Sequence, residues 1–296
     1  MSGTYKATGI NLKGMPFGES DRLITVLTPE FGLLRAIAPG SRKHDSSLRG
    51  RSGLFVVNNL LIVKGRNLDK ITQAESIESF TALSQDLKKL TASQYLAELA
   101  LYQALSDQPQ EELFVLLCDN LRQLEQLPSV HVLPFLTQAA FQLLALAGVA
   151  PIVHHCCVTQ VPLVPSFAHP DWRVGFSVAA GGTVTTEAMQ QLPSDTSSPA
   201  EESPRVAELG GSYGEKPAKP TELRLQLDAW ELGLLQHLAD RPVRDAFAPD
   251  HLPPPTDRAW HTIEQILRYC AEFYFEKPIR SATLLDACFA PVETFV

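Results

Sequence analysis

The chain has 296 residues, of which 45% are hydrophobic, and a formal net charge of −8 at pH 7. It is apolar enough to bury a substantial core, which excludes a chain that is disordered throughout. The charge is uneven, because residues 1–80 hold eleven Lys and Arg against seven Asp and Glu. A basic end on an acidic chain favours binding of a polyanion at that end alone.

The termini and cysteines restrict where the protein works. Met1–Ile10 has no apolar run, so we predict no secretory signal. The most apolar stretch, residues 135–153, is interrupted by polar side chains and predicts a buried helix instead of a membrane span. Five cysteines, an odd number, argue against a disulfide framework. We therefore expect a cytoplasmic protein.

Residues 1–80 are predicted to form one domain of short strands separated by turns. The expected strands are 7–12, 23–27, 33–38, 54–63 and 71–77, with a polar, basic loop at 40–53. Five short strands at fairly regular spacing indicate a small barrel or sandwich.

The apolar period becomes helical near residue 82, so we predict a second, all-α domain at 81–296. Its expected helices cover 83–102, 111–127, 135–146, 225–238 and 260–275. Residues 191–222 are rich in Ser, Pro, Glu and Gly, which predicts a disordered insertion. The alternative is that this segment docks a partner.

Four segments resemble the recombination mediator protein RecO. They are Met15–Leu23 with its Gly-Glu-Ser-Asp-Arg-Leu turn, Phe31–Gly40, the basic loop Ser41–Gly50, and Leu267–Ser281. The resemblance implies an α+β chain with an N-terminal OB-fold β-barrel followed by a helical domain. It also implies binding to single- and double-stranded DNA, strand annealing, and loading of RecA onto DNA coated by single-strand-binding protein. The implied partners are RecR, often RecF, and single-strand-binding protein, in the nucleoid.

The resemblance also implies a zinc site, but this chain lacks most of the cysteine ligands of that site. Many RecO proteins carry two Cys-x-x-Cys pairs, and here Cys156, Thr159, Thr185 and Ala188 fall at those four positions. Thr and Ala cannot replace thiolate ligands. We therefore predict a degenerate zinc-finger-like region at 150–190, with no metal and no other cofactor, held by packing of Val153, Phe167, Trp172 and Phe176. The purified protein should carry well under one zinc per chain.

The run His154-His155-Cys156-Cys157 leaves two alternatives open, a metal site and a cysteine- or metal-dependent hydrolase. No phosphate-binding loop, nucleophile elbow or His-Glu-x-x-His motif is present. We therefore predict a non-enzymatic protein with no catalytic residues. The alternative within the same fold is a general binder of single-stranded DNA or RNA.

The candidate DNA-binding residues are cations of the first domain, because OB folds combine cations along the backbone with aromatic faces for bases. They are Lys13, Arg22, Arg35, Arg42, Lys43, Arg49, Arg51, Lys64 and Arg66. Phe17 and Phe31 either stack on bases or belong to the core. If four to six phosphates are contacted, affinity should fall roughly 30- to 1,000-fold over a several-fold rise in salt. In the second domain we expect Arg122, Arg268 and Arg280 to be isolated cations, which makes them candidates for receiving an acidic tail of a protein partner.

Overall fold

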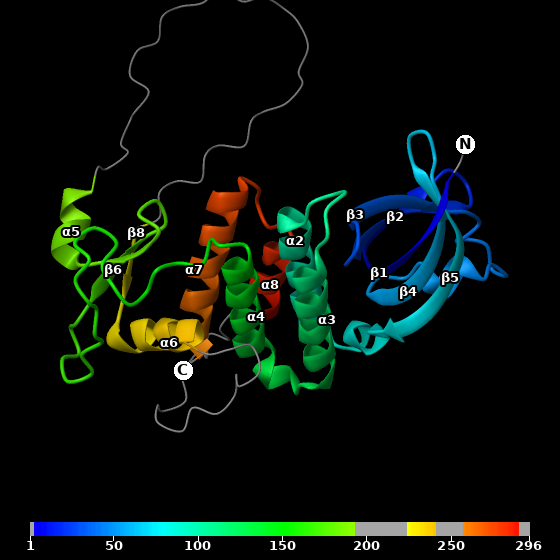
Figure 1. Ribbon diagram of the computed structural model, residues 1–296. Helices are drawn as coiled ribbons and strands as arrows, with labels where there is room; N and C mark the ends of the chain where they lie inside the picture. Colours follow the sequence, from blue (N-terminus) through cyan, green and yellow to red (C-terminus); the bar gives the residue numbers. More distant parts are fainter. Residues whose placement is uncertain (1–2, 193–223, 241–256, 290–296) are drawn as a thin grey trace, which may run out of the picture.

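The computed structural model describes residues 3–192, 224–240 and 257–289 (Figure 1). The insertion predicted at 191–222 lies outside the described residues, except that Gln191 and Leu192 end a short helix. The N-terminal strands form one end of the molecule, the long helices its middle, and a small sheet the opposite end.

Five strands close into a barrel in the order β1-β2-β3-β5-β4, in which only β3 and β5 run parallel. They are β1 (Thr4–Phe17), β2 (Asp21–Thr28), β3 (Gly32–Ala38), β4 (Val56–Val63) and β5 (Asp69–Ser79), with the one-turn helix α1 (Leu48–Arg51) between β3 and β4. Closure removes the unpaired strand edges. The predicted OB-fold-like barrel is confirmed.

Every second side chain along a strand points into the barrel, and these side chains fill its interior. Ile24 and Val26 of β2 point inward with Ala36 and Ala38 of β3, and they pack against Ile62 of β4. The strand predicted at 7–12 is longer in the structure, where β1 covers Thr4–Phe17, and the other predicted boundaries differ from the observed ones by at most two residues. β4 begins two residues later than its apolar run, because the backbone there turns through a positive φ of 57° at Phe55.

The long helices follow the barrel. They are α2 (Leu87–Gln103), α3 (Glu111–Gln126), α4 (Val132–Leu146), α6 (Ala229–Asp240), α7 (Asp257–Phe275) and α8 (Ala282–Phe289), with the short 3-10 helices η1 (Thr81–Gln85) and η2 (Ser129–His131). The apolar stretch Ser129–Leu146 is long enough to span a membrane, but 72% of it is buried within the protein. It is the core helix that its polar interruptions predicted.

The helices expected after residue 80 dominate the second domain, but the prediction that this domain is all-α is wrong. A three-stranded sheet, β7-β6-β8, is built from β6 (Val174–Ser177), β7 (Gly182–Val184) and β8 (Arg224–Leu227), and α5 (Thr186–Gln191) follows β7. The helix predicted at 225–238 begins only at residue 229. Glu231 N donates to the Asp228 carboxylate at 2.8 Å, and Asp228 N donates to the Glu231 carboxylate at 3.0 Å. This pair of hydrogen bonds is a capping box, which fixes the start of the helix.

The barrel and the helices share one apolar core. Ile10 and Leu27 on the outside of the barrel join the same buried cluster as the helix residues. Hydrogen bonds cross the junction as well, because Leu33 N donates to Leu105 O at 2.9 Å and Gln110 N donates to Pro29 O at 2.8 Å. The β2–β3 turn is therefore attached to the loop between α2 and α3.

Candidate nucleic-acid interface

Two cations share the outer side of strands β1, β2 and β3. Lys13 lies opposite Thr25, and Thr25 lies opposite Arg35. Residues directly opposite on neighbouring strands project to the same side of a sheet. Lys13 and Arg35 are both exposed, so the register brings together two predicted DNA-binding residues that are 22 positions apart in the sequence.

A second row beside it adds another cation and apolar groups. The pairing runs from Met15 to Leu23, then to Ile37, and on to Lys70 of β5. Lys70 is exposed, and Met15 keeps 44% of its surface accessible. Phe17, the next side chain of β1 on this side, keeps 40%. We call the exposed set Lys13, Met15, Phe17, Arg35 and Lys70 the strand face.

Sequence reasoning missed Lys70 and Met15 as candidates. The signal for Met15 was the alternation of residues 13, 15 and 17, which puts a cation, a flexible apolar chain and an aromatic ring on one side of a strand. The assignment of Lys70 needed the parallel pairing of β3 with β5, which no local pattern specifies.

The segment after β3 brings two predicted residues to one margin of the strand face. Arg42 Nη1 donates to the Gly18 and Glu19 carbonyls of the β1–β2 turn at 3.3 and 3.2 Å. Gly40 N donates to Asp21 at 2.7 Å, and this bond, a second one from Ser20 and the charges of Lys70 and Lys43 hold the Asp21 pKa below its usual range. Lys43 and Lys70 therefore lie near one carboxylate, although they come from different elements.

The β4–β5 turn lies at the same end of β3 as the β1–β2 turn. It carries Lys64 and Arg66, which are exposed. Ala38 pairs with Arg22 at the start of β2, and Ala36 pairs with Asp69 at the start of β5. The starts of β2 and β5 thus lie at the same end of β3, and the turns before them border the strand face at this end.

The remaining predicted residues belong to α1 and its contacts. Arg22 donates to Ser52 Oγ at 3.0 Å and to the Arg49 carbonyl at 3.5 Å, so it holds the end of α1. Arg51 is partly buried and donates to the Ser47 carbonyl at 3.1 Å, whereas Arg49 is exposed. The structure therefore does not bring all nine predicted cations to one surface.

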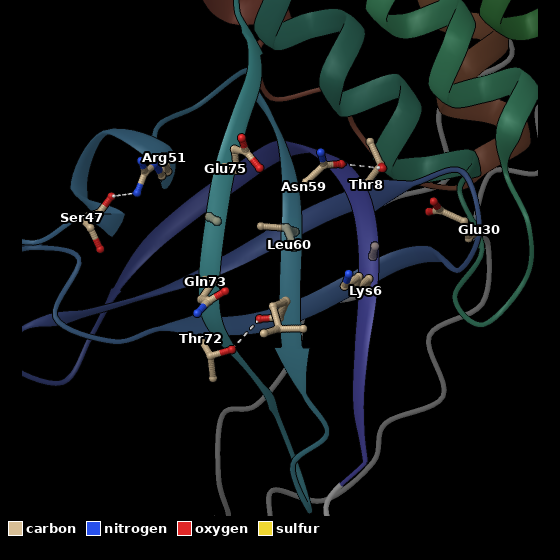
Figure 2. A pocket seen from close by; sticks show the side chains of 13 residues that line it. Lys6, Thr8, Glu30, Ser47, Arg51, Asn59, Leu60, Thr72, Gln73 and Glu75 are labelled. Carbon is tan, nitrogen blue, oxygen red and sulfur yellow. Dashed lines mark hydrogen bonds between the residues drawn. The ribbon is translucent and has the colours of Figure 1, made fainter.

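A hollow of about 670 Å³ lies beside β1, β4, β5 and α1. Figure 2 shows Arg51 on α1 at one margin, Glu30 at the opposite margin, and Lys6 and Glu75 on the strands between them. Two cations and two carboxylates give this hollow no net positive charge, so it suits a polyanion less well than the strand face.

The barrel cations differ in pairing from those of the helical domain. Ion pairs among the described residues include none of the nine predicted cations. In contrast, Arg122 contacts Glu78 and Asp119 at 2.8 and 2.5 Å, and Arg268 contacts Glu264 and Asp286 at 2.6 and 2.7 Å. The prediction that Arg122 and Arg268 are isolated is therefore wrong, because carboxylates already occupy both.

The His-His-Cys-Cys run does not converge on one point. His154 Nε2 lies 2.8 Å from the Asp240 carboxylate, His155 is exposed, and Cys156 is fully buried. In the part of the chain that the structure describes, no three His, Cys, Asp or Glu side chains are grouped to hold a metal ion.

A closed five-stranded barrel followed by a helical domain places the chain in the class of OB-fold-like proteins. Comparison with known families agrees. The profile "Recombination protein O N terminal" matches residues 1–80, and "Recombination protein O C terminal" matches residues 84–198.

Curated relatives extend the match to almost the whole chain. A "DNA repair protein RecO" of Cyanothece sp. is 52% identical, covering 99% of this chain and 98% of its own length. Proteins of the same name from Nostoc sp. strain PCC 7120 and Acaryochloris marina are 51% and 52% identical, over 98% and 99% of this chain and 98% and 97% of their own lengths. The chain therefore belongs to the RecO family of DNA repair proteins.

Proposed function

We propose that this chain is a non-enzymatic mediator of recombinational repair. In this proposal it binds DNA on the strand face, anneals complementary strands, and assists RecA loading on DNA coated by single-strand-binding protein. It would act with RecR, often RecF, and single-strand-binding protein, in the cytoplasm at the nucleoid. We infer a nucleic-acid-binding domain at 1–80, a helical domain at 81–296, and a degenerate zinc-finger-like region at 150–190.

One observation carries the proposal. Lys13, Arg35 and Lys70 lie in adjacent rows of one surface, beside the exposed Met15 and Phe17. None of the three forms an ion pair with an acidic side chain in the described part of the chain. Cations neutralise successive phosphates and release counterions, while flat apolar groups stack on bases of any sequence. The surface therefore suits single strands without sequence preference, which annealing requires.

The test measures annealing of two complementary oligonucleotides, one of them precoated with single-strand-binding protein, at low and moderate salt. We expect the protein to accelerate annealing and the acceleration to weaken with salt. The triple variant K13A/R35A/K70A should make the negative slope of log affinity against log salt shallower by about 2, since each phosphate contact contributes about −0.7 to it.

Lys6→Ala is the matched control, because Lys6 is an exposed cation of the same strand that lines the hollow instead. If the single variants K6A and K13A lost equal amounts of salt-dependent affinity, the strand face would be removed from the proposal. Binding without annealing of the coated strand would favour a general single-strand binder on the same fold.

A further inference from the structure

The four positions at which the family resemblance implies zinc ligands hold Cys156, Thr159, Thr185 and Ala188. A structural zinc site needs four thiolate or imidazole ligands around one ion, and only one such group is present among these four. No described His, Cys, Asp or Glu cluster completes it. These residues do not fit the metal.

We infer that the sulfur of Cys156 takes the place of the ion, as the centre of a metal-independent, hydrogen-bonded link between two segments. Thr159 N lies 3.4 Å and Thr185 N lies 3.3 Å from Cys156 Sγ, and both backbone N–H groups donate to it. The sulfur thus joins the turn after Cys156 to the start of α5, as a bound ion would.

The turn itself closes through the backbone. Cys156 N donates to Val161 O at 2.9 Å, and Gln160 N donates to Cys156 O at 2.9 Å with Gln160 at a φ of 59°. Cys157 N donates to Thr183 O at 2.8 Å, which attaches the turn to β7. The loop conformation therefore has its own hydrogen bonds and needs no ligand to hold it.

The other positions have taken on structural roles that suit their side chains. Thr185 Oγ1 accepts from Ala188 N at 3.2 Å, so Thr185 caps the N-terminus of α5. Ala188 is 2% exposed and packs with Val184 and Cys156 in a small apolar cluster. A capping hydroxyl and a buried methyl group occupy the places where two further thiolates would stand.

The electrostatics of the thiol are consistent with this role. Burial raises the pKa of Cys156, whereas hydrogen bonds from Thr159 and Thr185 lower it, and the balance brings it from 9.0 to about 7. Burial instead raises the pKa of its neighbour Cys157, which is only partly buried. The two adjacent cysteines are therefore inequivalent, and Cys157 is a matched control.

The packing predicted for this region needs one correction. Val153 and Phe176 are buried and Trp172 packs against the core, but Phe167 is 48% exposed and contacts Trp230 at a ring-centroid distance of 4.6 Å. Phe167 therefore packs beside α6.

The first experiment measures the zinc content of the full-length protein and its thermal unfolding with and without EDTA. We expect well under one zinc per chain and an unchanged Tm. Cys156→Ala should lower the Tm by about 3–6 °C, because two N–H groups lose their acceptor. Amide hydrogens of residues 159 and 185 should also exchange faster, while Cys157→Ala should change neither quantity. Stoichiometric zinc after dialysis, or equal behaviour of C156A and C157A, would overturn the inference.

A gain-of-function variant tests the geometry independently. T159C/T185C/A188C restores three thiols around Cys156, so we expect it to bind one zinc per chain and to lose stability in EDTA. The same three substitutions in a C156A background should bind zinc far more weakly. Failure of the triple variant to bind zinc would mean that the four positions do not surround one centre.

Discussion

The free energy of DNA binding at the strand face should have two contributions, which a substitution at a single residue can separate. Cations contribute a salt-dependent term, whereas a stacked ring contributes a term that salt barely changes. Phe17 is 40% exposed at the end of β1, directly opposite Asp21 and two residues beyond the exposed Met15. The other aromatic candidate, Phe31, is partly buried and packs edge-on against Tyr5 at 5.3 Å, which assigns it to the barrel packing.

Phe17→Ala should therefore weaken binding of a short single-stranded oligonucleotide by about 1–3 kcal/mol, the usual contribution of one base stacked on an aromatic ring. The slope of log affinity against log salt should stay at its wild-type value. Fluorescence anisotropy titrations at several salt concentrations measure both. Phe273→Ala is the control, since Phe273 is also an exposed aromatic ring but lies on α7. An altered salt slope in F17A would indicate that Phe17 positions the cations and does not stack.

At the scale of elements, the sequence predicted the elements with long periodic patterns. The five strands and the helices α2, α3, α4 and α7 follow from alternation or helical spacing over many residues. The short strand β6 was missed because its four residues are all buried and show no alternation. The short strand β8 was missed because Leu225 and Leu227 also fit the start of the helix predicted at 225–238. The Asp228–Glu231 capping box was the local signal that could have placed the start of α6.

The candidate site was less predictable than the fold for a similar reason. The cations that share a surface are determined by strand register and barrel closure, which are properties of pairs of distant strands. Charge count selected Arg22, but its guanidinium faces Ser52 and the end of α1. Lys70 was not selected, although β5 places it in the row of Met15 and Ile37.

One element junction should be sensitive to pH. Glu98 of α2 accepts hydrogen bonds from Tyr102 Oη, Arg280 N, Ser281 N and Ser281 Oγ, and it thereby holds the start of α8. Burial raises the Glu98 pKa and these hydrogen bonds lower it, with a net decrease below the ordinary 4.5. A carboxylate whose folded-state pKa is depressed stabilises the fold above its unfolded pKa and loses that contribution as pH falls through the folded value.

Glu98→Gln should consequently be less stable than the wild type at neutral pH, and the difference should shrink as pH falls below about 4.5. Chemical denaturation at pH 7, 5 and 3.5 measures the difference in the free energy of unfolding between the variant and the wild type. Glu75→Gln provides the comparison, because the Glu75 side chain is exposed on β5 and its stability effect should be small at every pH. A gap that widens toward low pH would contradict the assignment of an ionised Glu98.

At the scale of the molecule, the barrel and the helices should unfold as one unit. They share an apolar core, and the β2–β3 turn contacts the α2–α3 loop through Gly32, which pairs with Ser106. Gly32 has a φ of 66°, and a Cβ there would lie 2.0 Å from the Leu105 carbonyl oxygen. Only glycine fits, both because of the left-handed backbone and because the helical domain touches this point.

Gly32→Ala should therefore destabilise both parts together, by at least about 2 kcal/mol from the backbone conformation and the displaced loop. Tryptophan fluorescence reports the helical domain alone, since Trp172, Trp230 and Trp260 all lie beyond the barrel, and hydrogen exchange of β1–β5 reports the barrel. The two probes should give one unfolding midpoint in the wild type and one lower common midpoint in G32A. Gly50→Ala, at an open position on α1, should leave both midpoints nearly unchanged. If G32A lowered only the barrel midpoint, the barrel would be an independently folding unit, and DNA bound on the strand face would have no rigid connection to the helical domain.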